Sequence, residues 1–175
     1  MRLLLVPVIA FALSSCWVGT DLYAPSDARP VIPPGVYKAT ARDEPAHVYR
    51  ISMLPNGLTQ FDGGDENDVY GLAPLGTDGI TFVAWEDVKP DPVVPATPGD
   101  PNQNYALLVR QADGAFFIYL PTCSDDQAER VRKLGAMIKP GTVATCMFPA
   151  RAILQEALLL LPRDDKAAIK LTPVP

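Results

Sequence analysis

Proline is the feature that most restricts the folds open to this chain of 175 residues. The sequence holds 19 prolines, where average usage of about 5% predicts roughly nine. Each proline fixes φ and removes a backbone N–H, so the sequence disfavours long helices and favours short strands joined by defined turns. Prolines also gather in residues 17–34 and 86–103. We therefore expect these two segments to be extended rather than regular.

The overall composition limits the functions that the chain can have. Hydrophobic residues make up 48% of the chain, which is enough for one domain with a sizeable core. The net charge of −5 and the sequence pI of about 4.8 disfavour nucleic acid as a partner. One histidine and three cysteines leave little material for the usual His-based catalytic or zinc sites. We predict that the protein uses no cofactor.

The N-terminus has the pattern of an export signal. A positive start, Met1-Arg2, precedes an apolar run from Leu3 to Leu13. This run suits the hydrophobic region of a signal peptide and is shorter than the roughly 20 residues that a membrane-spanning helix needs. Small residues follow the run, and then Cys16.

At this point the chain resembles the bacterial lipoprotein precursors, whose signal ends in a lipobox. Leu13-Ser14-Ser15-Cys16 matches the pattern of leucine, two small residues and the cysteine that is lipidated. The resemblance covers only the first 16 residues. The alternative is an ordinary secretory signal with an incidental cysteine.

The resemblance implies that residues 1–15 are removed and that Cys16 carries diacylglycerol and, on its new amine, a fatty acid such as palmitate. Two or three acyl chains anchor a protein stably. In enteric members of the family, aspartate after the cysteine favours the inner membrane. Trp17 stands there instead, so we expect an outer-membrane lipoprotein facing the periplasm.

The same resemblance bears on the other cysteines. Export places them in an oxidising compartment. If Cys16 carries lipid, Cys123 and Cys146 are the pair that remains, and we expect them to form a disulfide. Two free buried thiols are the alternative. A redox pair is less favoured because the sequence lacks a Cys-x-x-Cys arrangement.

The patterning beyond the signal predicts an α+β domain. We expect residues 16–34 to be a proline-rich tether and residues 35–175 to be a single globular domain. Alternating apolar residues and turn signals predict strands at 36–41, 47–53, 58–61, 69–72, 79–85, 105–110, 115–120, 143–148 and 167–171. Two helices are expected, from Ser124 to Gly135 and from Pro149 to about Leu161. The strands would form a mostly antiparallel sheet of about five to seven strands, open or curled towards a small barrel, with the C-terminal helix packed on it.

Candidate polar sites are few. His47 begins a predicted strand without a nucleophile motif, and we interpret it as a surface or strand-edge residue rather than a catalytic base. The best cation candidates lie in an acidic loop. Its carboxylates are those of Asp62, Asp65, Glu66 and Asp68. Their spacing does not fit an EF-hand, so we favour a solvated hairpin loop and predict no metal site.

The aromatic residues on predicted strands have two interpretations. They either line a ligand cavity within a curled sheet or belong to the core, which is the more common role. These residues are Trp85, Tyr105, Phe116, Phe117 and Tyr119.

Together these observations favour a lipid-anchored, non-enzymatic envelope protein that has a structural role or binds another envelope protein. One alternative is a small-ligand carrier, which requires an apolar cavity of roughly 300 Å³ or more. The other is a hydrolase using acidic residues or a bound cation, which requires converging carboxylates in a cleft. The sequence does not predict the oligomeric state.

Overall fold

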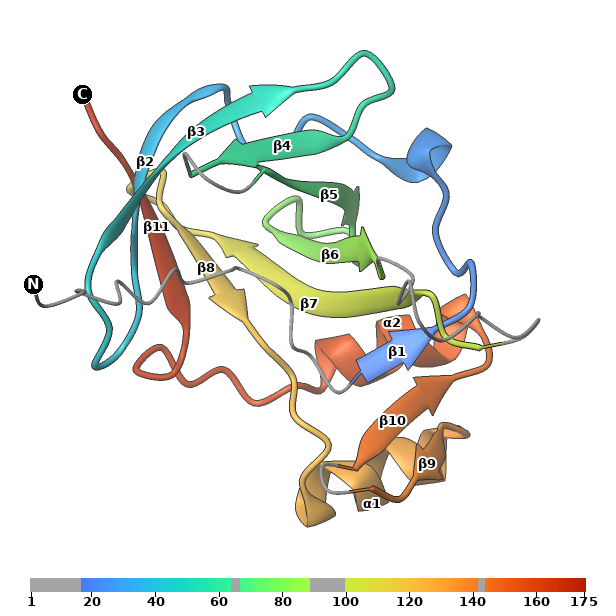
Figure 1. Ribbon diagram of the computed structural model, residues 1–175. Coiled ribbons are helices and arrows are strands. Elements are labelled where there is room, and N and C mark those ends of the chain that lie inside the picture. The colour runs from blue at the N-terminus through green and yellow to red at the C-terminus, as the bar shows by residue number, and fades with distance from the viewer. Residues whose placement is uncertain (1–16, 64–66, 89–99, 142–143) are drawn as a thin grey trace, which may run out of the picture.

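The computed structural model describes residues 17–63, 67–88, 100–141 and 144–175. Figure 1 shows that these residues form one sheet with two short helices beside it. The helices are α1 (Asp125–Leu134) and α2 (Arg151–Leu159), and a 3-10 turn, η1, spans Pro25–Asp27. The strands are β1 (Trp17–Gly19), β2 (Gly35–Thr40), β3 (His47–Met53), β4 (Thr59–Asp62), β5 (Asn67–Pro74), β6 (Thr81–Asp87), β7 (Gln103–Arg110), β8 (Phe116–Tyr119), β9 (Met137–Lys139), β10 (Thr145–Phe148) and β11 (Ile169–Pro173).

Eight of the strands close into an antiparallel barrel. Their order is β6-β5-β4-β3-β2-β11-β8-β7, and pairing between β6 and β7 completes the circle. The curled, mostly antiparallel sheet expected from the sequence is therefore confirmed. The expected strand number was too low, because the described residues form 11 strands, of which β1 and β9 were not predicted. The helices are a minor part of this α+β arrangement.

The remaining strands branch from β7. Residues Leu107–Arg110 of β7 pair with β8, whereas Gln103 and Asn104 pair with β1. From there β1 pairs in parallel with β10, and β10 pairs antiparallel with β9. Figure 1 shows β9, β10 and α1 gathered below the barrel. This branch therefore links β7 of the barrel, through β1 and β10, to β9.

Side chains alternate between the two faces along each strand, and those that point inwards fill the interior of the barrel. Tyr49 and Ile51 of β3 pack there with Leu108 of β7 and Phe116 of β8. One cavity of about 20 Å³ remains inside the barrel, with Ile32, Phe61 and Leu108 in its lining, and it is far smaller than the roughly 300 Å³ or more of a ligand pocket. The interior is therefore a packed core.

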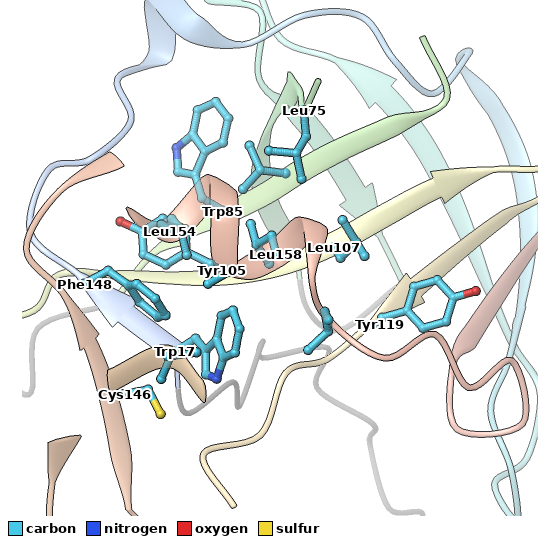
Figure 2. Packing of buried hydrophobic residues seen from close by; sticks show 14 of the residues in the cluster. Trp17, Leu75, Trp85, Tyr105, Leu107, Tyr119, Cys146, Phe148, Leu154 and Leu158 are labelled. Atoms are coloured by element: carbon cyan, nitrogen blue, oxygen red, sulfur yellow. The ribbon is translucent and has the colours of Figure 1, made fainter. Parts of the chain in front are cut away.

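A second core lies outside the barrel wall. Figure 2 shows Leu154 and Leu158 of α2 packed with Trp85 of β6 and with Tyr105 and Leu107 of β7. Strand β7 is consequently covered on both faces: residues 105–108 are at most 1% exposed. Strand β8 is covered less completely, since Phe117 is only half-buried at the margin of this second core.

Residues 17–34 differ from the expected tether. Trp17 is 1% exposed, Tyr23 is 3% exposed and Ile32 is 1% exposed, so the segment belongs to both cores. The amide side chain of Gln103 fixes it to β7, accepting from the Tyr23 N–H at 3.1 Å and donating to the Tyr23 carbonyl at 2.7 Å. The folded domain therefore includes residues 17–34 and does not start at residue 35. Its apolar residues follow no helix or strand period, which is why the sequence pattern hid their burial.

The second proline-rich segment, 86–103, falls partly outside the described residues, which leave out 89–99. On either side of that gap, β6 and β7 continue to pair as far as Asp87 and Gln103.

Candidate functional site

The site most strongly suggested by the sequence is the anchor residue Cys16, which lies outside the described residues. Its neighbour, Trp17, is the first described residue and is held firmly. Trp17 pairs with Cys146 in the parallel β1–β10 ladder, and its indole N–H donates to the Thr122 carbonyl at 2.8 Å. Its ring lies 4.9 Å from that of Phe148. The position next to Cys16 is thus part of the folded domain.

The predicted disulfide between Cys123 and Cys146 is confirmed, with a Cα–Cα distance of 5.6 Å. It joins the loop before α1 to β10, and so links the first helix segment to the strand that precedes α2. Because Cys146 pairs with Trp17, the disulfide also braces the start of the domain.

A stack of side chains holds the N-terminal segment against the barrel. The rings of Trp85 and Tyr23 stack with centroids 4.8 Å apart, and the Arg151 guanidinium lies 4.0 Å from the centre of the Tyr23 ring. Arg151 in turn forms an ion pair with Asp27 of η1 at 3.0 Å. On the other side, Trp85 lies across Gly71, where a Cβ atom would come within 2.0 Å of the indole. The stack thus runs from β5 through β6 to α2.

A polar cleft of about 350 Å³ opens beside this stack, over the adjoining ends of β5 and β6. It is lined by three carboxylates, two side-chain amides and Trp85. The polar residues are Asn67, Asp68, Glu86, Asp87 and Asn104.

Hydrogen bonds fix two of the carboxylates in the cleft. Asn104 donates to Glu86 at 3.2 Å, and Gln103 donates to Asp87 at 3.0 Å. The Tyr70 hydroxyl hydrogen-bonds Glu86, and the pKa of Tyr70 lies far above its ordinary value because of burial and then of the negative charges of Glu86 and Asp68. Tyr70 therefore stays neutral and donates. Carboxylates held in place in this way suit a cationic or hydrogen-bond-donating ligand.

A second hollow is apolar. It measures about 340 Å³ and lies between α1 and the end of α2, with Trp17 in its wall. Val131, Leu134, Ala157 and Leu161 contribute apolar surface, while Gln127, Arg130 and Lys133 supply the polar groups. Sequence reasoning missed this groove because it depends on the packing of two helices and on an unpredicted strand.

The structure describes two of the four carboxylates that the sequence offers as cation candidates. Asp62 ends β4 and Asp68 lies in β5, where it lines the polar cleft, whereas Asp65 and Glu66 lie outside the described residues. Among the residues that the structure describes, no group of three Asp, Glu, His or Cys side chains could hold a metal ion. The cleft residues Glu86 and Asn104 were not predicted, because they face each other only through the β6–β7 register.

The other predicted residues occupy structural positions. His47 begins β3, is half-buried, and lies 4.5 Å from the Tyr49 ring, centroid to centroid. The five strand aromatics do not share one cavity. Phe116 points into the barrel, whereas Trp85, Tyr105 and Tyr119 belong to the outer core, with half-buried Phe117 packed against it.

No helix in the described part of the chain has the length and hydropathy needed to span a membrane. Comparison of the chain with protein-family models, with curated proteins and with solved structures finds no match.

Proposed function

We propose that this chain is a lipid-anchored protein of the bacterial cell envelope, in the outer membrane facing the periplasm, and that it acts by binding rather than by catalysis. The observation that carries the proposal is the position of Trp17. The proposed lipobox would be cleaved just before Cys16, and the next residue is 1% exposed within the fold. Cleavage there would release the whole domain and leave a single residue to carry the lipid.

Lipidation is tested by replacing the anchor residue in the native host. Cys16→Ala should abolish incorporation of labelled palmitate and release the protein from the membrane fraction. Ser15→Ala is the matched control, because alanine keeps a small residue in the lipobox, and it should remain labelled. Labelled Cys16→Ala protein would overturn the proposal.

The polar cleft is the binding site that the geometry favours. Glu86 and Asp87 each accept a hydrogen bond from an amide side chain, which fixes the position of both carboxyl groups. This arrangement supports recognition of a cationic group on an envelope partner. Three carboxylates in one cleft are also compatible with the hydrolase alternative, but the hydrogen bonds that fix two of them favour binding. A carrier role inside the barrel is not favoured, because the cavity there is about 20 Å³.

Crosslinking in intact cells tests the cleft. A photoreactive residue at Val88, which is 41% exposed and lines the cleft, should capture a partner. The control position is Val48 on β3, which is 55% exposed and outside the cleft lining. Glu86→Gln should weaken capture from Val88. Equal capture from both positions, or capture unaffected by Glu86→Gln, would contradict this assignment.

A further inference from the structure

The apolar groove between α1 and α2 lies beside the predicted anchor. Trp17 lines it, and Cys16 directly precedes Trp17 in the sequence. Lipid attached at Cys16 would therefore enter the bilayer next to this groove. This argument rests on the proposed function, since it requires the lipid.

The chemistry of the groove suits the surface of a bilayer. Its outer edge is formed by Leu160, which follows α2 and leaves 62% of its surface exposed. Arg130 and Lys133 lie on the α1 side of the same groove and are both exposed. Apolar side chains flanked by cations are the pattern by which proteins rest at the boundary between headgroups and acyl chains.

The ion pair of Lys133 does not prevent such contact. Lys133 lies 2.9 Å from Glu129, but both side chains are largely exposed, at 72% and 66%. Exposed pairs of this kind contribute little to stability. Lys133 can therefore turn towards a lipid phosphate at little cost.

Without a tether, the groove would stay close to the membrane surface. Because residues 17–34 are packed into the domain, lipid at Cys16 would hold the groove close to the membrane at a high effective concentration. The acyl chains of Cys16 are a weaker candidate for the occupant. They are fully buried in a bilayer, whereas the open groove would cover them only in part.

We propose that the groove and Leu160 form a membrane-docking face. In this arrangement Leu160 enters the boundary between headgroups and acyl chains, and Arg130 and Lys133 contact the phosphates of anionic phospholipids. The domain would then lie against the membrane in one orientation instead of moving freely about its anchor.

The test uses the full lipidated chain in vesicles of phosphatidylcholine and phosphatidylglycerol. An environment-sensitive fluorophore is attached at Leu160→Cys, or at Val48→Cys on β3 as the control, since Val48 is 55% exposed. Spin-labelled phospholipids should quench the probe at residue 160 several-fold more than the probe at residue 48. Replacing Arg130 and Lys133 by glutamine should weaken docking by about fivefold for each cation removed.

The outcomes separate the two proposals. Protein that fails to sediment with the vesicles has no anchor, and the proposed function falls with the docking face. Protein that sediments but shows equal quenching at both positions overturns the docking face alone. A blue-shifted but unquenched probe at residue 160 overturns it in favour of the protein's own acyl chain. A shift that grows with protein density overturns it in favour of a second copy of the chain.

Discussion

At the scale of single residues, Gly71 allows the Trp85 ring to pack directly against the backbone of β5. The indole of Trp85 occupies the space that a side chain would need, at 2.0 Å from an ideal Cβ. Gly71→Ala should therefore displace Trp85 from its stack with Tyr23 and destabilise the protein by about 1 to 3 kcal/mol. Urea unfolding measures this loss.

Gly35→Ala is the matched control for that substitution. Its added Cβ would meet only the Tyr37 ring at 3.7 Å, an ordinary contact. We expect it to change the free energy of unfolding by less than about 1 kcal/mol. A Gly71→Ala protein as stable as the Gly35→Ala protein would show that Trp85 is free to move.

The disulfide is the second feature at this scale. Cys123 and Cys146 are 23 positions apart, and a loop of this size corresponds to about 3 kcal/mol in the chain-entropy treatment. Replacing both cysteines by serine should lower the free energy of unfolding by roughly that amount. Denaturant titration of the oxidised protein and the double variant checks this, and equal midpoints with equal slopes would contradict it.

At the scale of elements, the contact between η1 and α2 depends on the charge of Asp27. The backbone N–H of Ala24 and then the Arg151 guanidinium hold the pKa of Asp27 below its ordinary value of 3.8. A lowered carboxyl pKa stabilises the fold fully above the ordinary pKa, and this stabilisation is lost as the pH falls through the lowered value.

Asp27→Asn should therefore cost up to about 1 kcal/mol at neutral pH. Its difference from the unmodified protein should shrink as the pH falls below about 4. Asp43→Asn removes a carboxylate whose side chain is 90% exposed and serves as the control for the change in net charge. Unfolding free energies measured across the acid range test this, and a difference independent of pH would contradict it.

The observed helices and strands also show which elements can be predicted from sequence patterns. Alternation predicted β3, and the strands predicted at 105–110 and 115–120 pair with each other as β7 and β8. Gly135 ends α1 with a φ of 105°, as expected for a helix stop. By contrast, β1 has three residues and is a strand only because β7 and β10 lie on either side of it. Such a segment is defined by its neighbours and has no local signal.

At the scale of the whole molecule, the barrel and the N-terminal segment form one folded unit. Residues 17–34 supply Trp17 and Tyr23 to the outer core and Ile32 to the barrel interior. Removing them should leave both cores incomplete and abolish cooperative thermal unfolding. Circular dichroism of chains starting at residue 17 and at residue 35 makes the comparison. Equal melting temperatures would show that residues 17–34 act as the tether expected from the sequence.

The candidate sites also differ in whether the sequence reveals them. The lipobox is a prediction from the order of four adjacent residues, and the disulfide could be predicted from the number of cysteines. The polar cleft needs Glu86 of β6 opposite Asn104 of β7, and that register follows from closure of the barrel. The apolar groove needs two helices placed beside Trp17. Neither arrangement can be predicted from periodicity.

Lipid at Cys16 is proposed to anchor a domain that is folded from Trp17 onwards. Mass spectrometry of the N-terminal peptide, from protein purified out of native membranes, tests it most directly. The peptide should start at Cys16 and carry the mass of a diacylglyceryl group and an amide-linked fatty acid. A peptide that starts elsewhere, or one with an unmodified Cys16, would contradict it.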